Sequence, residues 1–218
     1  MLYNLHEMSS KNLFTFLSTY TPAVFGVGAM IMIACDVITL NLNTDYNAIH
    51  ETISELILYP YGWIITVGMI ILFIIHMFLS AVIFSSPAAR CHRLVKLAGV
   101  LFALIALGFI VIMLFKTDPG DEIITLSGGI HVVVATAMYV LFPVACGSLT
   151  IALWRHRKSE SLIVFSVIIT AVSLLIAYLV MPQNETNYIG AYERLLTLVN
   201  LSWLVMAGFR LPRLLNIC

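Results

Sequence analysis

The stretch LAGVLFALIALGFIVIMLF, residues 97–115, runs for nineteen residues without a charged side chain. An α-helix rises about 1.5 Å per residue, so about 20 apolar residues cross the roughly 30 Å hydrocarbon core of a bilayer. The run is continuous, whereas a strand of a membrane β-barrel would alternate apolar and polar residues. It therefore predicts a helix that spans a membrane.

Five further runs have the same character, which gives six expected spans at about 18–40, 62–85, 96–116, 129–153, 161–181 and 191–210. The first is the least uniform because Thr19, Thr21, Pro22 and Asp36 interrupt it. Hydrophobic residues make up 61% of the chain and charged residues 10%, whereas soluble domains carry about a quarter charged residues. We expect an all-α polytopic membrane protein, a six-transmembrane-helix bundle, forming one integral membrane domain over residues 1–218.

Charge is distributed unequally between the two sides of this expected bundle. Nine of the 11 basic residues fall on one side: Lys11, Arg90, Arg93, Lys96, Arg155, Arg157, Lys158, Arg210 and Arg213. Eight of the 11 acidic residues fall on the other: Asp45, Glu51, Glu55, Asp118, Asp121, Glu122, Glu185 and Glu193. Loops rich in Lys and Arg stay in the cytoplasm, so both termini are expected there. The formal net charge is +0 with no long basic run, so we expect no nucleic acid partner.

Ionisable residues gather in NAIHETISELILYP, residues 47–60, in the acidic loop between the first two spans. If this segment is helical, His50 and Ser54 share one face, and Glu51 and Glu55 share the adjacent face. We expect an amphipathic helix at the outer membrane interface. A solvated loop helix with ordinary surface charges is the alternative.

Other spans also carry ionisable residues where they reach the acidic side. The third span leaves through residues 115–119, the fourth opens with Gly129-Ile130-His131, and the sixth opens with Glu193-Arg194. An ionisable group in a span normally faces the bundle interior and finds a partner there. These residues either tie the helix ends together or line a site. The candidate ligand-binding residues are His50, Ser54, Glu55, Asp118, His131, Glu193 and Arg194.

Two functional classes fit this cluster, and a structural membrane subunit is a third. As a binding protein, the chain would hold a lipid headgroup or small amphiphile in an outward-facing polar pocket, with membrane lipids as its partners. As an intramembrane hydrolase of lipids, it would use zinc held by His50, Glu55, Asp118 and His131 to activate a water molecule. Zinc is considered as a cofactor for this alternative alone. Without metal, Ser54 would be the nucleophile and His50 or His131 the base.

Whether the chain is an enzyme stays open at this point. Neither H-E-x-x-H nor G-x-S-x-G occurs, and the candidate zinc ligands come from distant segments. We favour binding because no recognisable catalytic spacing accompanies the candidate residues. His76 lies deep in the second span without a histidine partner at its depth, so we expect a hydrogen-bonded interior histidine rather than a haem ligand.

The span ends resemble a known family. Ile53-Ser54-Glu55-Leu56, the exit at 115–119, Gly129-Ile130-His131 and Glu193-Arg194 are similar to bacterial domain-of-unknown-function family 998, over about residues 20–210. This resemblance implies a six-helix bundle in a bacterial inner membrane. Ile53-Ser54-Glu55 is also similar to the Frag/DRAM/Sfk group, which implies a lipid-related role without an established reaction. Ile57 stands where a small residue, often Gly, is expected, which puts the local backbone geometry in doubt.

Overall fold

The computed structural model describes residues 2–120, 124–154, 160–180 and 188–216, and within them every regular element is a helix. The six long helices are α1 (Leu2–Leu42), α2 (Gly62–Ser85), α4 (Arg93–Leu114), α5 (Leu126–Trp154), α6 (Glu160–Val180) and α7 (Ile189–Leu215). Two short helices lie between them, the 3-10 helix η1 (Glu55–Leu58) and α3 (Pro87–Cys91). The predicted all-α class is confirmed.

All six long helices contain a segment long and apolar enough to cross a membrane, which confirms the predicted number of spans. The expected limits agree with the helices to within about three residues except at the start of α1 and at the end of α7, which continues to Leu215 rather than ending near residue 210. The first span was expected to begin at residue 18, but α1 begins at Leu2 and continues through Pro22. Proline removes a backbone donor from a helix. The hydroxyls of Thr19 and Thr21 donate to carbonyl oxygens four residues earlier, at 2.9 and 2.8 Å, and so add hydrogen bonds beside it.

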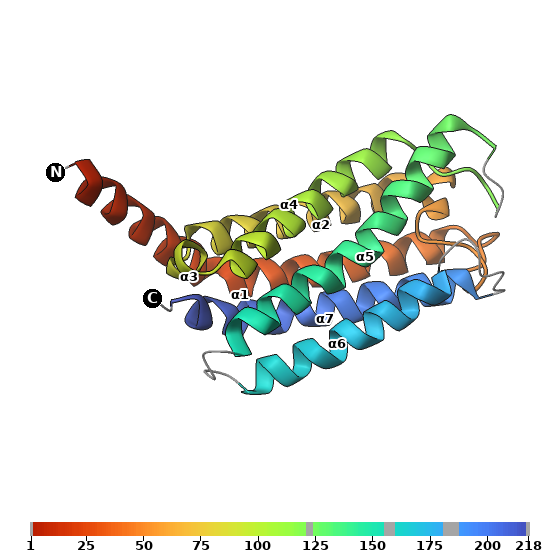
Figure 1. The fold of residues 1–218 in the computed structure, drawn as a ribbon. Helices are drawn as coiled ribbons and strands as arrows, with labels where there is room; N and C mark the ends of the chain where they lie inside the picture. Colours follow the sequence, from red (N-terminus) through yellow and green to blue (C-terminus); the bar gives the residue numbers. More distant parts are fainter. Residues whose placement is uncertain (1, 121–123, 155–159, 181–187, 217–218) are drawn as a thin grey trace.

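The six long helices form a ring in the order of the chain. Each packs against the next one along the sequence, and α7 returns to pack against α1. Neighbours are antiparallel because the connections between them are short. Both termini and α3 therefore lie at one end of the bundle, and the connection between α1 and α2 lies at the other (Figure 1). The first turns of α1 project beyond the bundle.

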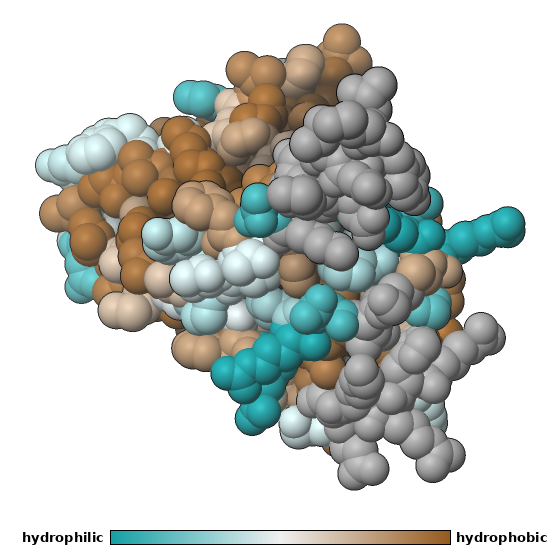
Figure 2. Space-filling view, turned by 90° about the vertical axis from the view of Figure 1, so that its left-hand side faces the viewer, coloured by the Kyte–Doolittle hydropathy of each residue, from teal (hydrophilic) through white to brown (hydrophobic). Residues whose placement is uncertain are grey.

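The two ends of the bundle differ in charge. The basic end carries α3, the start of α4 and the end of α7, with Arg90, Arg93, Lys96, Arg210 and Arg213. Hydrophilic side chains project from this end, with hydrophobic surface beside them (Figure 2). The acidic end carries Asp45, Glu51, Glu55, Asp118 and Glu193. The structure thus places the described acidic and basic loops as the sequence predicted, while the side of the membrane that each faces stays a prediction.

Apolar side chains cover the outside of the ring as well as its interior. Each long helix exposes large hydrophobic residues, among them Met30, Trp63, Leu107, Val133, Leu175 and Phe209. A contiguous apolar surface of this kind is unstable in water and stable against lipid. Inside the ring, Phe102, Phe142 and Trp203 pack together with ring centroids 5.6–5.9 Å apart. The Trp203 indole N–H donates to Ser166 Oγ at 2.8 Å and so joins α7 to α6.

Candidate functional site

The connection between α1 and α2, residues 43–61, lies on the first two turns of α7. The Ala191 N–H donates to Ile49 O at 3.2 Å, and the single proton of the Tyr46 hydroxyl is shared between Glu51 O and Thr52 O, at 2.7 and 2.6 Å from the hydroxyl oxygen. These bonds use backbone oxygens that a helix would use internally. The expectation of an amphipathic helix within residues 47–60 is therefore wrong. Turns fill most of this range, and η1 alone is helical.

Arg194 fixes this connection to α7 and α1. Its Nε and Nη2 lie 3.2 and 3.4 Å from the two carboxylate oxygens of Asp36, and Nη2 also donates to the Tyr46 hydroxyl at 2.8 Å. Its Nη1 lies 2.9 Å from Ala48 O, 3.1 Å from Glu51 O and 3.2 Å from Gly190 O. The three guanidinium nitrogens are thus directed at acceptors of the protein itself.

Glu193 faces into the ring, unlike its neighbour Arg194. It is 7% exposed, and its Oε2 accepts a hydrogen bond from the Ile53 N–H at 2.5 Å. Its Oε1 accepts from the Tyr139 hydroxyl at 2.8 Å. A carboxylate in this position joins α7, α5 and the 43–61 connection, and it remains a strong acceptor because each oxygen has two lone pairs.

Glu55 closes a capping box at the start of η1. The Thr52 N–H donates to Glu55 Oε2 at 2.7 Å, while the Glu55 N–H donates to Thr52 Oγ1 at 3.2 Å. Such a reciprocal pair satisfies two donors at a helix start. Glu55 Oε1 also accepts from the Gly120 N–H at 2.8 Å. The carboxylate therefore holds the connection after α4 beside the connection after α1.

Asp118 stabilises the start of α5. Its carboxylate accepts from the Ile124 and Thr125 N–H groups at 2.9 and 2.8 Å and from the Thr125 hydroxyl at 2.8 Å. These hydrogen bonds, first of all those from Thr125, hold the pKa of Asp118 below its ordinary value. A side chain at Gly128 would occupy the position of the Asp118 carboxylate, so glycine is required there.

His131 is buried at 3% exposure, one turn into α5. Its Nδ1 lies 2.8 Å from Phe115 O, in the segment that follows α4. Its Nε2 is buried and has no hydrogen-bond partner among the residues that the structure describes. A buried polar atom without a partner is uncommon in folded proteins and marks a position where a ligand or water can supply one.

A cavity of about 90 Å³ with both polar and apolar side chains in its wall, here called the vestibule, lies between α5, α7 and the two connections at the acidic end. Its lining comprises Thr52, Ser54, Thr117, His131, Val132, Ala135, Thr136, Tyr139, Ile189 and Glu193. Its volume suffices for several water-sized groups. The vestibule thus combines hydroxyl groups, a buried carboxylate and a histidine nitrogen in one space.

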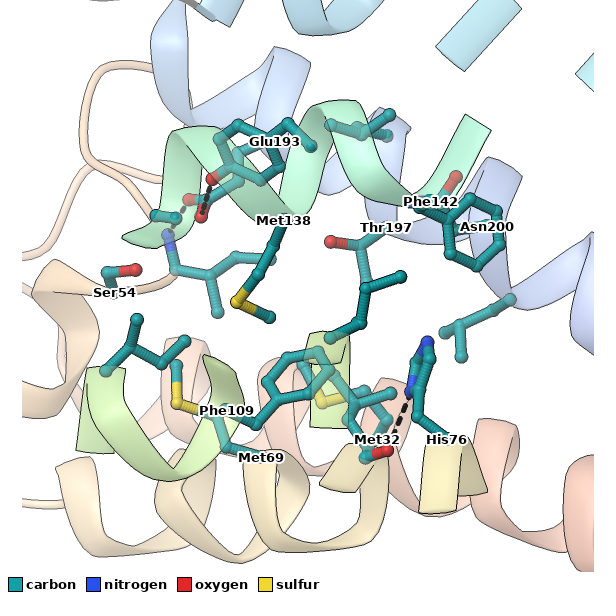
Figure 3. Close-up of a pocket in the computed structure, with 18 of the residues that line it drawn as sticks. Met32, Ser54, Met69, His76, Phe109, Met138, Phe142, Glu193, Thr197 and Asn200 are labelled. Carbon is teal, nitrogen blue, oxygen red and sulfur yellow. Dashed lines mark hydrogen bonds between the residues drawn. The ribbon is translucent and has the colours of Figure 1, made fainter. Parts of the chain in front are cut away.

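A second cavity of about 90 Å³, here called the inner cavity, lies inside the ring beside the vestibule. The two share the lining residues Ser54, Ala135, Tyr139 and Glu193. The middle of the inner cavity is apolar, and its lining there includes Met32, Met69, Ile105, Phe109, Ile112, Met138 and Leu196. Figure 3 shows Ser54 and Glu193 at one end and His76 and Asn200 at the other, with methionine side chains between them.

The family matched by this chain is described as a protein of unknown function (DUF998), and the match covers residues 26–210. That is most of the chain. This chain therefore belongs to the DUF998 family. No curated protein and no solved structure matches it. The resemblance to this family is thereby confirmed, whereas the similarity to the Frag/DRAM/Sfk group stays a prediction.

The sequence elements that indicated DUF998 meet in space at the acidic end. Ile53 bonds to Glu193, Glu55 bonds to Gly120 directly after the 115–119 exit, and His131 bonds to Phe115. Each of these three hydrogen bonds joins two segments that are not adjacent in the sequence. The backbone around Ile57, which the departure from the family pattern had put in doubt, forms the 3-10 helix η1.

The candidate site residues divide into three groups. Ser54, His131 and Glu193 line the vestibule. Three further candidates hold the surrounding segments through the hydrogen bonds given above: Glu55, Asp118 and Arg194. His50 is exposed, and its ring stacks on Tyr188 at a centroid distance of 6.3 Å. Within the described part of the chain, no three His, Cys, Asp or Glu residues are close enough to hold a metal ion.

Several residues of the site were missed in the sequence, although a signal for them exists. Tyr139 lies eight residues after His131, about two turns further along the same face of α5. Glu193, Thr197 and Asn200 are spaced by four and three residues and so form one polar stripe on α7. His76 was expected to be a hydrogen-bonded interior histidine, and its Nδ1 does lie 2.7 Å from Leu72 O.

Proposed function

We propose that this DUF998 protein binds a single-chain amphiphile, with the polar headgroup in the vestibule and the hydrocarbon tail in the inner cavity. The observation that carries the proposal is that the two cavities are neighbours, with Ser54, Ala135, Tyr139 and Glu193 in the walls of both. Binding sites for small molecules are typically apolar pockets with a few polar groups at defined positions. Polar side chains in one cavity beside an apolar cavity match a molecule that has a polar headgroup and an apolar tail.

The lining of the inner cavity favours a flexible hydrocarbon tail. Met32, Met69 and Met138 approach the cavity from α1, α2 and α5. Unbranched methionine side chains adapt to ligands of irregular shape. A tail in this cavity lies between helices that themselves span the bilayer, so it exchanges one hydrocarbon environment for another. We therefore propose membrane lipids or their single-chain relatives as the partners.

A lipid hydrolase receives less support from the same residues. Ser54 and His131 both line the vestibule, which is the arrangement that a nucleophile and base would need. However, His131 Nε2 has no hydrogen-bond partner within the described ranges, so Ser54 and His131 do not form a ready-made pair. The four proposed zinc ligands do not share one site. Glu55, Asp118 and His131 bond to different backbone groups, and His50 lies at the surface. Binding without turnover is the simpler proposal.

Substitution of Ala135 tests this proposal, because Ala135 lines both cavities at their junction. A phenylalanine at 135 would fill the junction, so the Ala135→Phe variant should lose bound amphiphile. Ala137→Phe is the matched control, since Ala137 lies two residues further along α5 with an exposed side chain. Native mass spectrometry of the protein released from mild detergent measures the retained adduct by mass.

We expect an adduct of lipid-like mass on the wild type and on Ala137→Phe, and its loss from Ala135→Phe. Equal retention by all three proteins would contradict the proposal, because the ligand would then sit elsewhere. A wild type that retains no adduct and binds no added single-chain amphiphile would favour the structural-subunit alternative. Release of a hydrolysed product from an added lipid ester would favour the hydrolase.

A further inference from the structure

The ring of His131 determines which chemistry its free nitrogen can offer. Its Nδ1 lies 2.8 Å from Phe115 O, and a carbonyl oxygen can only accept, so Nδ1 carries the ring proton. In a neutral imidazole, Nε2 then has a lone pair and no hydrogen. This Nε2 is the buried atom for which the described residues provide no partner. His131, one of the residues that line the vestibule, therefore carries an unmatched acceptor.

Glu193 adds a second strong acceptor to the same space. Its two hydrogen bonds, from Ile53 and Tyr139, leave lone pairs on both oxygens. Among the described residues, neither Lys nor Arg lines the vestibule. The nearby Arg194 directs its guanidinium nitrogens to Asp36, Tyr46 and backbone oxygens. An ionised Glu193 therefore has no cation among the described residues that line the vestibule.

From these acceptors we infer that the vestibule accepts a primary ammonium group, so that the ligand is an amine-bearing amphiphile. This inference rests on the proposed function and names the chemistry of the polar end. An ammonium has three donors and no acceptor, which complements Glu193, His131 Nε2 and the hydroxyl oxygens of the lining. It also gives the intramembrane carboxylate an opposite charge, as ionisable groups in spans require.

An anionic headgroup is disfavoured by the same groups. A carboxylate or phosphate in the vestibule would lie near Glu193 with no cation of the lining beside it, and like charges repel strongly where water is excluded. An alcohol headgroup would donate one hydrogen bond but supply no charge. The expected order of affinity for equal tails is therefore amine, then alcohol, then carboxylate. A free small amine shares the ammonium chemistry but leaves the inner cavity empty.

Four probes separate these possibilities with the full chain in a nonionic detergent. Dodecylamine, dodecanol and dodecanoate have the same tail length and differ in the headgroup, and ethanolamine supplies the ammonium without a tail. Native mass spectrometry measures the dissociation constant of each probe. Micelles without protein serve as the blank. We expect dodecylamine to bind about tenfold more tightly than dodecanol, the amount typical of one charged hydrogen bond. Dodecanoate and ethanolamine should bind more weakly still.

Glu193→Gln tests the assignment within the vestibule. Glutamine keeps an acceptor for Tyr139 but removes the charge, so the preference for dodecylamine over dodecanol should fall to about threefold or less. Glu51→Gln is the matched control, because Glu51 bonds to Asn47 and Tyr59 and does not line the vestibule. The ratio of two affinities on one protein sample does not depend on how much of that sample is folded.

Each outcome bears on one of the two claims. Equal affinity for the three tailed probes, tightest binding of dodecanoate, or an unchanged preference in Glu193→Gln would overturn the ammonium assignment and leave amphiphile binding in place. Failure of every tailed probe to bind would overturn the proposed function itself. If ethanolamine bound as tightly as dodecylamine, the ammonium site would stand. The tail would then contribute nothing to the affinity.

Discussion

Glu193 and Arg194 are neighbours on α7, yet their side chains point to different parts of the molecule. Glu193 lies within the ring and lines both cavities. Arg194 lies between α1 and the 43–61 connection, where its charge is paired with Asp36 at 3.2 Å. A sequence motif of two adjacent charges thus separates into a residue that lines both cavities and a residue that positions the 43–61 connection. The positioning role can be measured without any ligand.

We predict that Arg194→Gln lowers the free energy of unfolding by about 3 kcal/mol. Removing one partner of a largely buried ion pair, here with side chains 14% and 16% exposed, leaves the other charge uncompensated, which costs this order of free energy. Here Asp36 would lose its cation, and Tyr46 and two backbone oxygens of the 43–61 connection would lose a donor. Unfolding of the purified protein by a denaturing detergent, followed by circular dichroism, measures the change.

Arg210→Gln is the control for this substitution, because Arg210 is exposed near the end of the same helix. It should change the unfolding free energy by no more than about 0.5 kcal/mol. The double substitution Asp36→Asn with Arg194→Gln should cost less than the sum of the two single changes, since no unpaired charge remains. Strict additivity would show that the Asp36–Arg194 contact does not contribute to stability.

At the scale of elements, the 43–61 connection shows what local patterns reveal and what they miss. The spacing of His50, Ser54, Glu51 and Glu55 predicted an amphipathic helix, whereas the structure has only the short helix η1, which starts at a Thr52-x-x-Glu55 capping box that was not predicted. The helix is absent because residues about 140 positions away take its backbone groups, as the Ile53–Glu193 bond illustrates. Helical periodicity contains no information on such distant partners.

The close approach of this connection to α7 depends on Gly190. A side chain there would collide with the carbonyl oxygens of Glu51 and Ala48. Gly190→Ala should therefore push the connection away from α7, lower the unfolding free energy by about 1–3 kcal/mol and weaken amphiphile binding. Detergent-induced unfolding and the native mass spectrometry described above measure the two effects.

Gly26→Ala provides the comparison, since an added methyl group at Gly26 of α1 meets no described atom within 4 Å. Alanine is the better helix former, so this variant should be at least as stable as the wild type. If Gly190→Ala behaved like Gly26→Ala, the connection would not be packed against α7 as closely as the structure has it.

At the scale of the whole molecule, hydropathy alone predicted six helices and their limits to within a few residues, apart from the start of α1 and the end of α7. This was possible because a bilayer demands long apolar helices and so leaves a clear signal in composition. The ring arrangement and the inner cavity were not predicted. Met69, Phe109 and Leu196 line the cavity, and nothing in their sequence context separates them from residues of an ordinary packed core. Cavities depend on how helices pack, which residue type does not fix.

Orientation is the property of the whole molecule that decides where the ligand comes from. The basic end should face the cytoplasm because Lys and Arg resist translocation, which leaves the vestibule on the outer side. In a background without the four native cysteines, Asp45→Cys and Lys96→Cys place single thiols at exposed positions at opposite ends. A membrane-impermeant maleimide added to intact cells should label position 45 and leave position 96 unlabelled until the membrane is opened. The reverse pattern would place the vestibule in the cytoplasmic half of the bilayer, and an amphiphile would then enter it from the inner leaflet.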